Sequence, residues 1–245
     1  MVSQRQGAST QQQEASKREE RAQRILDAAA TLILRWGYNK TTIDDISRQA
    51  GVAKGTIYLH WKTREDLFLA LIRREKIELA EDLKRRIAED PEGGTLRGIF
   101  KHSALAVMQR PLMKAILLRD MEVLGKLSQG ELSNAAHLER LEGFKTYLEV
   151  LRELGVVRTD LSLQAQAYMI SAIMSGFLLV IPFMPDEFIL PDEEIADLMA
   201  ETIHRTLEPG HVLSSDVLQA ASNSSIQYMD HYIVSQKEQF QQDVS

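Results

Sequence analysis

The chain has 245 residues, of which 44% are hydrophobic and 26% charged, with a net charge of −6 and no cysteine. These proportions are typical of a soluble globular protein with material for a large core, and the lack of cysteine excludes disulfides and thiolate metal sites. Residues 1–75 carry 13 Lys and Arg against 9 Asp and Glu, whereas the remaining residues carry 16 against 26. A basic N-terminal part on an acidic remainder favours contact between that part and a polyanion.

The first predicted elements are a disordered arm and a helix. Residues 1–16 are rich in Gln and Ser and have no apolar periodicity, which predicts disorder. They lack a basic segment followed by an apolar run, so we expect no signal peptide and a cytoplasmic protein. From Lys17 onward apolar residues recur at helical spacing as far as Trp36, and Gly37 then supplies a stop. The pattern predicts a helix over about 18–36.

Residues 42–62, TIDDISRQAGVAKGTIYLHWK, predict two short helices joined by a tight turn. Thr42 and Asp45 have the spacing of a capping box, and Gly51 stands where the turn needs a residue that tolerates positive φ. Lys54–Leu59 reads as the second helix. This arrangement is the helix-turn-helix, whose second helix enters the DNA major groove.

The block TTIDDISRQAGVAKGTIYLHWKTREDLF resembles the N-terminal DNA-binding domain of TetR-family transcriptional regulators. The resemblance covers roughly 65 residues and implies an all-α protein: an N-terminal three-helix helix-turn-helix domain followed by a helical ligand-binding and dimerisation domain. It further implies a homodimer, a double-stranded DNA operator and a small-molecule effector. The chain departs from the family at Ala53, where a capping Ser or Thr is common, and at Ser47, where Ala is common.

The predicted DNA contacts lie on and around the second helix. Lysine pairs with guanine or phosphate, threonine offers a hydroxyl and a methyl, and glycine lets DNA approach the backbone closely. The aromatic, histidine and second lysine resemble the phosphate-clamping residues of the family, whereas Thr42 both caps its helix and is a candidate contact. The predicted contacts are Thr42, Lys54, Gly55, Thr56, Tyr58, His60 and Lys62.

A long helix begins after Thr63, which has a capping-box partner in Asp66, and continues to a break at residues 90–94. We place the domain boundary inside this helix, so that residues 17–75 form the DNA-binding domain and 76–210 the effector-binding and dimerisation domain. Breakers then divide the second domain into helices, expected at about 95–109, 111–127, 131–154, 162–181 and 192–207.

Effector pockets are mostly apolar with a few polar groups, and bulky side chains on these helices are candidates to line one. Each residue alone is more often core than pocket, and a histidine on an apolar face is more often structural. The candidate ligand-binding residues are Phe100, Met108, Met121, His137, Phe144, Tyr147 and Tyr168.

Residues 167–184 form the most apolar stretch of the chain. The stretch is about long enough to span a membrane, but Ser171, Ser175, Gly176 and Pro182 interrupt it, so we favour a buried helix and no membrane partner. The resemblance implies that helices 162–181 and 192–207 pair with their copies in a dimer. The candidate interface residues are Met174, Gly176, Phe177, Ile195, Met199 and Ile203.

Residues 211–245 form a C-terminal extension beyond the usual end of the family, with an amphipathic helix expected over about 225–241. No phosphate-binding loop, nucleophile elbow, zinc helix or cysteine nucleophile occurs, so we expect no catalytic residue, metal or cofactor. The predicted function is a ligand-responsive repressor that releases a near-palindromic operator. An activator or a protein-binding auxiliary regulator of the same fold remains the alternative, and a helical enzyme is disfavoured.

Overall fold

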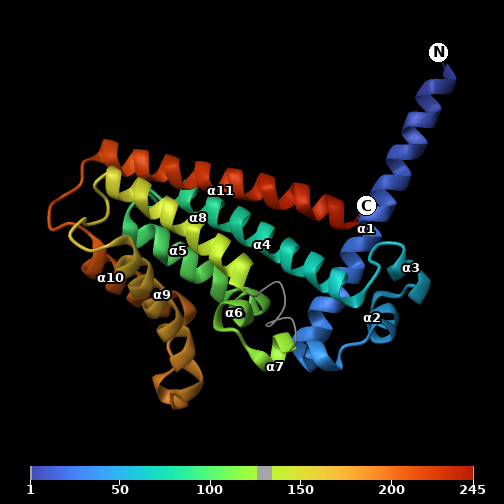
Figure 1. The fold of residues 1–245 in the computed structure, drawn as a ribbon, viewed down its shortest axis with the longest axis horizontal. Coiled ribbons are helices and arrows are strands. Elements are labelled where there is room, and N and C mark those ends of the chain that lie inside the picture. The colour runs from blue at the N-terminus through green and yellow to red at the C-terminus, as the bar shows by residue number, and fades with distance from the viewer. Residues whose placement is uncertain (1, 126–133, 245) are drawn as a thin grey trace.

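The computed structural model describes residues 2–125 and 134–244, and every regular element within these ranges is helical. The predicted all-α fold is therefore confirmed. We use "head" for the expected DNA-binding domain, residues 17–75, and "body" for residues 76–210. Figure 1 shows the head at one end of an elongated molecule and α9 and α10 towards the other.

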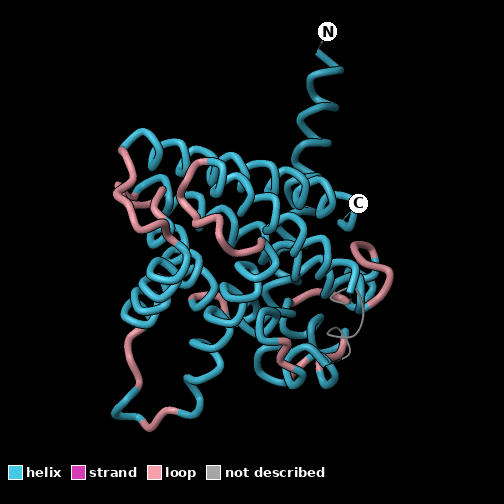
Figure 2. The backbone as a smooth tube through the Cα atoms, turned by 60° about the vertical axis from the view of Figure 1, so that its left-hand side comes forward, coloured by secondary structure: helices cyan, strands magenta, loops and turns pink. Residues whose placement is uncertain are grey.

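Helix α1 runs from Val2 to Trp36, so the chain is helical where a disordered arm was expected over residues 1–16. Five of these sixteen residues are Gln, a good helix former, and extending an existing helix avoids the unfavourable nucleation step. The first half of α1 projects away from the rest of the molecule in both views (Figures 1 and 2). From Ala22 onward, α1 contributes buried side chains to the core of the head.

The head is completed by η1 (Tyr38–Lys40), α2 (Ile43–Ala50) and α3 (Lys54–Tyr58). Thr42 and Asp45 form the predicted capping box at the start of α2, and Gly51 ends that helix with a left-handed φ of 66°. Ile46, Ile57 and Trp61 are buried in one cluster with residues of α1 and α4. This packing fixes the orientation of α3.

Helix α4 (Arg64–Glu89) joins head and body, and Thr63 and Asp66 form the predicted capping box at its start. Leu67, Phe68 and Leu71 are buried in the head cluster, whereas Ile87 belongs to the main cluster of the body. One continuous helix therefore belongs to both cores.

The body contains α5 (Leu96–Met108), α6 (Pro111–Leu118), α7 (Met121–Leu124), α8 (Asn134–Glu153), α9 (Leu163–Val180), η3 (Ile181–Phe183), η4 (Asp186–Phe188) and α10 (Asp192–Leu207). The helix expected over 111–127 is divided, because Arg119 adopts a left-handed conformation with φ 51°. Asp120 then caps α7 by accepting hydrogen bonds from the backbone of Glu122 and Val123. Leu112 and Ile116 of α6 reach the head cluster, so the body also supports α1.

The C-terminal extension folds into α11 (Ser215–Val244), which starts ten residues before the expected helix. It lies beside α4 and returns the C-terminus towards the head (Figures 1 and 2).

Candidate nucleic-acid interface

The short helix α3 exposes its start and buries its middle. Ile57 is fully buried, whereas Lys54 and Gly55 are exposed and Thr56 is half-buried. Tyr58 is 47% exposed, and Lys62 is exposed just before the cap of α4. Together with Thr42, the exposed cap of α2, these residues line the ends of neighbouring helices. Such an arrangement offers amide and side-chain donors to a phosphate backbone or to base edges.

Lys54 is held by an ion pair with Asp44 of α2, at a distance of 2.9 Å between Nζ and a carboxylate oxygen. The hydrogen bond to Asp44 raises the pKa of Lys54 above its ordinary value, so the amine is charged at neutral pH. Because both side chains are at least half exposed, the pair orients the lysine more than it stabilises the fold.

Gly55 is not required by packing within the chain. A Cβ built on this residue meets no atom within 4 Å, and its φ is not positive. Glycine weakens a helix by roughly 1 kcal/mol relative to alanine, so its presence here needs a reason outside the free protein. Close approach of a partner to the backbone would supply that reason.

His60 differs from the other predicted contacts because it is buried, with 7% exposure. Its ring lies 5.2 Å from that of Trp61, and its Nδ1 has no hydrogen-bond partner. Burial, together with the charges of Arg18 and Arg21 on α1, lowers the pKa of His60. The structure thus places a neutral imidazole behind the exposed face formed by its neighbours.

The two departures from the family have simple structural consequences. Ala53 precedes α3 and provides no side-chain cap, so the helix starts without one. Ser47 is buried, and its hydroxyl donates a hydrogen bond to the backbone oxygen of Asp44 within the same helix.

The predicted effector residues divide between core and surface. Phe100, Met108 and Tyr147 are buried in the main body cluster, and Phe144 packs against it. Burial raises the pKa of Tyr147 to about 12, and its hydroxyl lies 2.6 Å from that of Ser225 on α11. These four residues are thus brought together.

Two predicted effector residues do not join them. Met121 is 53% exposed and Tyr168 is 77% exposed, so neither lines a cavity within the chain. Helical spacing identifies bulky residues but does not show which way each one faces. The side chain of His137 lies outside the described residues.

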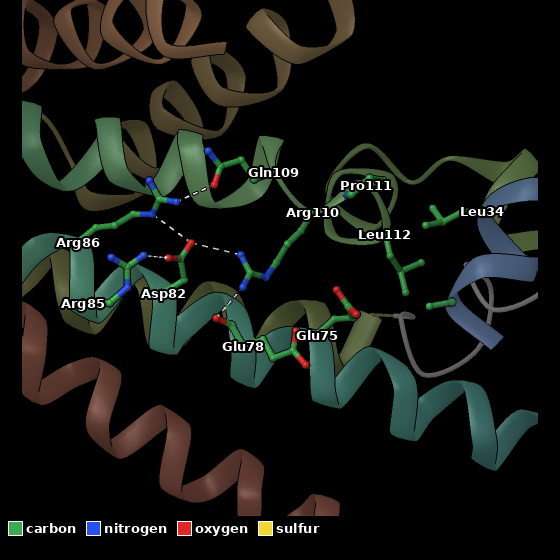
Figure 3. Close-up of a pocket in the computed structure, with 11 residues that line it drawn as sticks. Leu34, Glu75, Glu78, Asp82, Arg85, Arg86, Gln109, Arg110, Pro111 and Leu112 are labelled. Carbon is green, nitrogen blue, oxygen red and sulfur yellow. Dashed lines mark hydrogen bonds and ion pairs between the residues drawn. The ribbon is translucent and has the colours of Figure 1, made fainter. Parts of the chain in front are cut away.

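A cavity of about 540 Å³ opens between α1, α4 and the α5–α6 connection, and none of its lining residues was predicted as a site residue. Figure 3 shows charged side chains along most of its wall. Burial alone would raise the pKa of Asp82, but hydrogen bonds from Arg86 and Arg85 outweigh it, and that pKa is lowered. Arg110 also reaches Asp82, at 3.2 Å. The helical spacing of Glu78, Asp82 and Arg86 was the available signal in the sequence.

The predicted interface residues on α10 need correction. Ile195, Met199 and Ile203 are buried within the chain, at 8% exposure or less, because this face of α10 packs against α5. They therefore have little surface to offer a second copy. On α9, Met174 and Phe177 are half-buried and Gly176 is exposed.

The exposed apolar surface lies instead where α9 passes through η3 and η4 towards α10. We call residues 179–190 the apolar tip. Its exposed large side chains are Leu179, Val180, Phe183, Met184, Phe188, Ile189 and Leu190. Figure 2 shows this segment protruding from the molecule.

Within the described residues, the segment Leu163–Phe183 passes a length and hydropathy test for a membrane span, with 17% of it buried. A single segment of this kind is weak evidence, because helices at protein interfaces pass the same test. The described residues contain no group of three or more metal-ligating side chains.

Comparison with known proteins agrees with the helix-turn-helix geometry. Residues 25–71 match the family described as bacterial regulatory proteins, tetR family. The fatty acid metabolism regulator protein of Bacillus subtilis (strain 168) is 38% identical over 65 residues, which is 26% of this chain and 34% of that protein. The HTH-type transcriptional regulator AcrR of Shigella flexneri is 28% identical over 183 residues, covering 71% of this chain and 84% of AcrR.

Two solved structures share the fold over most of the chain. SmeT, the repressor of the Stenotrophomonas maltophilia multidrug efflux pump SmeDEF, aligns with a TM-score of 0.58 and 22% identity, covering 79% of this chain and 93% of SmeT. FadR from Bacillus subtilis, in complex with stearoyl-CoA, aligns with a TM-score of 0.52 and 21% identity, covering 74% and 96%. Residues 25–71 therefore match the TetR-family DNA-binding domain, and the chain has the helical fold of TetR-family transcriptional regulators.

Proposed function

We propose that this protein is a homodimeric repressor that binds a near-palindromic operator and releases it when a small apolar or amphipathic molecule binds the body. The observation that carries the proposal is the exposed start of α3, where Lys54 and Gly55 face solvent while Ile57 anchors the helix. Helix-turn-helix proteins insert this end of the second helix into the major groove. We expect the protein to act in the cytoplasm, without a catalytic activity.

A dimer is supported by the apolar tip. Monomeric soluble proteins rarely expose contiguous apolar patches larger than a few hundred Å², and the tip presents seven large apolar side chains within twelve residues. Pairing of α9 and the tip with a second copy would cover this surface. The two α3 helices would then be set about one DNA turn apart, roughly 34–36 Å.

An amphipathic effector is supported by two observations. The solved structure of FadR contains stearoyl-CoA, and the buried cluster with Phe100, Phe144 and Tyr147 supplies apolar surface with one hydroxyl. Release of DNA requires that the effector bind the releasing geometry more tightly than the DNA-bound one.

Footprinting on the DNA that flanks the gene tests the proposal, with and without stearoyl-CoA and shorter acyl-CoAs. We expect a protected, near-palindromic site whose protection is lost with an effective ligand. Failure to protect any such site would contradict operator binding. Protection that increases the output of a transcription assay would instead favour an activator.

The two exposed lysines separate backbone contacts from base contacts. Lys62→Ala should weaken binding to all DNA sequences and reduce the slope of log affinity against log salt by about 1, because one phosphate contact is lost. Lys54→Ala should change sequence preference if the amine contacts a base. Equal losses on operator and random DNA would assign Lys54 to the backbone, and an unchanged slope would remove Lys62 from the phosphate contacts.

A further inference from the structure

Helix α11 spans the distance between body and head. Its 30 residues correspond to a length of about 45 Å, and it lies beside α4 over much of that length. Both views show that α11 starts among the body helices and ends near α1 (Figures 1 and 2). It therefore lies antiparallel to α4, which is the covalent connection between head and body.

At the body end, α11 is built into the core. The Tyr147 hydroxyl is hydrogen-bonded to Ser225, and the ring of Tyr147 stacks on that of Tyr228 with 5.1 Å between centroids. Two glycines make room for the helix. A Cβ on Gly94 would lie 2.1 Å from the backbone oxygen of Leu218, and one on Gly143 would lie 3.2 Å from the Tyr228 hydroxyl. The body is thus shaped around α11, and Tyr147 belongs to the candidate effector cluster.

Along α4, contacts of several kinds continue towards the head. Lys84 pairs with Asp230, and Ile233 packs with Ile77 and Ala80. Lys237 then pairs with Glu81, at 2.6 Å.

At the head end, the Arg73 side chain donates a hydrogen bond to the backbone oxygen of Gln239, at 3.3 Å. Phe240 packs against the buried cluster of the head itself. The contacts of α11 therefore extend from the body core to the head core.

We propose that α11 is a second tie between body and head, through which changes around Tyr147 reach the helix-turn-helix. A single helix such as α4 bends more readily than two helices packed along their length. A displacement of the aromatic pair Tyr147 and Tyr228 moves α11 directly, and the far end of α11 holds the first turns of α4 through Arg73 and Phe240. The regulatory part of this inference rests on the proposed function, whereas the mechanical tie does not.

The mechanical tie is tested in the full-length protein by measuring a distance across it. Because the chain has no cysteine, Gln49→Cys on α2 and Glu149→Cys on α8 give two unique exposed sites for spin labels. Labelled protein is diluted with excess unlabelled protein, so that only distances within one chain are measured. We expect Phe240→Ala combined with Lys237→Glu to widen the distance distribution.

Two matched variants control this experiment. Val234→Ala changes an exposed residue of the same helix and should leave the distribution unchanged. Adding Glu81→Lys to Lys237→Glu restores opposite charges and should recover part of the narrow distribution, which a general loss of folding would not allow. An unchanged width in the Phe240→Ala, Lys237→Glu protein would overturn the tie.

The regulatory role is tested by hydrogen exchange with operator DNA. Coupling is reciprocal, so operator binding at the head should slow exchange of amides around residues 144–151, and Phe240→Ala should abolish that slowing. Equal slowing in both proteins would overturn a route through α11. If the wild-type protein binds no operator, the proposed function fails, and the distance measurement still decides the tie.

Discussion

At the scale of single residues, two glycines of the helix-turn-helix have opposite roles. Gly55→Ala should stabilise the free protein by about 0.5–1 kcal/mol, because a methyl group there meets open space and alanine favours helix. The same change should weaken operator binding, because the methyl group would separate α3 from DNA. Urea unfolding and fluorescence anisotropy measure the two effects.

Gly51→Ala is the control for the Gly55→Ala variant. Gly51 also has open space around it, but its φ of 66° is strained for alanine, so the variant should lose about 1–2 kcal/mol of stability. Unchanged operator affinity in a stabilised Gly55→Ala protein would show that DNA does not approach this backbone.

His60 gives the head a pH-dependent stability. Its pKa is lowered by burial from an ordinary value of 6.5, so the folded head resists a proton that the unfolded chain binds. Stability is therefore unaffected above pH 6.5 and decreases as the pH falls from there through the lowered pKa. Between pH 7.5 and pH 5.5, the melting temperature measured by circular dichroism should fall less for His60→Gln than for the wild type.

His211→Gln, at an exposed position, should show the same decrease in melting temperature with pH as the wild type. If both variants match the wild type, another group is responsible for the acid sensitivity.

Local signals in the sequence were sufficient for residues whose role depends on near neighbours. The capping boxes of Thr42 and Thr63 and the left-handed turn at Gly51 were predicted and are present, because each involves residues at most three positions apart. Burial of His60 was not predicted, since it depends on the packing of α1 behind α3. The exposure of Met121 and Tyr168 was also missed, because it too depends on tertiary packing and not on near neighbours in the sequence.

At the scale of elements, periodicity predicted helices better than it predicted their partners. The stripe of Ile195, Met199 and Ile203 is real, but α5 covers it within the chain. An apolar stripe indicates that a helix face is buried and carries no information about which surface buries it. The extent of α11 was likewise underestimated, because six of its first ten residues are Ser, Asp, Asn or Gln.

The close packing of α11 on Gly94 predicts that adding one methyl group there destabilises the protein. Gly94→Ala would place a methyl carbon 2.1 Å from the backbone oxygen of Leu218, and that contact forces the start of α11 away from the body. Overpacking of this kind costs about 1–3 kcal/mol, which urea unfolding measures. Gly210→Ala, with open space around its Cβ, should be nearly neutral. Equal stability of the two variants would mean that the start of α11 does not pack against Gly94.

At the scale of the whole molecule, the helix-turn-helix and the exposed apolar surface lie in different parts of the molecule. The basic residues of 1–75 lie at the head, and the apolar tip of residues 179–190 lies on the far side of the body. Family resemblance predicted the all-α fold, whereas the site of pairing stays a prediction. It did not identify the tip, most of whose residues lie after α9 in loops and 3₁₀ turns without helical periodicity.

Phe183 gives the sharpest test of dimerisation, because it is 80% exposed in the apolar tip. Phe183→Asp would place a charge in the proposed interface, and burying an unpaired charge is strongly unfavourable. We expect the variant to sediment as a monomer at concentrations where the wild type is a dimer. Its circular dichroism spectrum should keep the wild-type helix content, because the side chain contributes little to the core of one chain.

Operator affinity should decrease with the dimer, since two linked heads bind a palindrome far more tightly than one. Val212→Asp, at a position with 96% exposure outside the tip, should remain dimeric and bind DNA as the wild type does. A dimer that survives Phe183→Asp would exclude the tip as the interface. In that case the exposed apolar residues would need another partner, and vesicle flotation of the wild type would show whether that partner is a membrane.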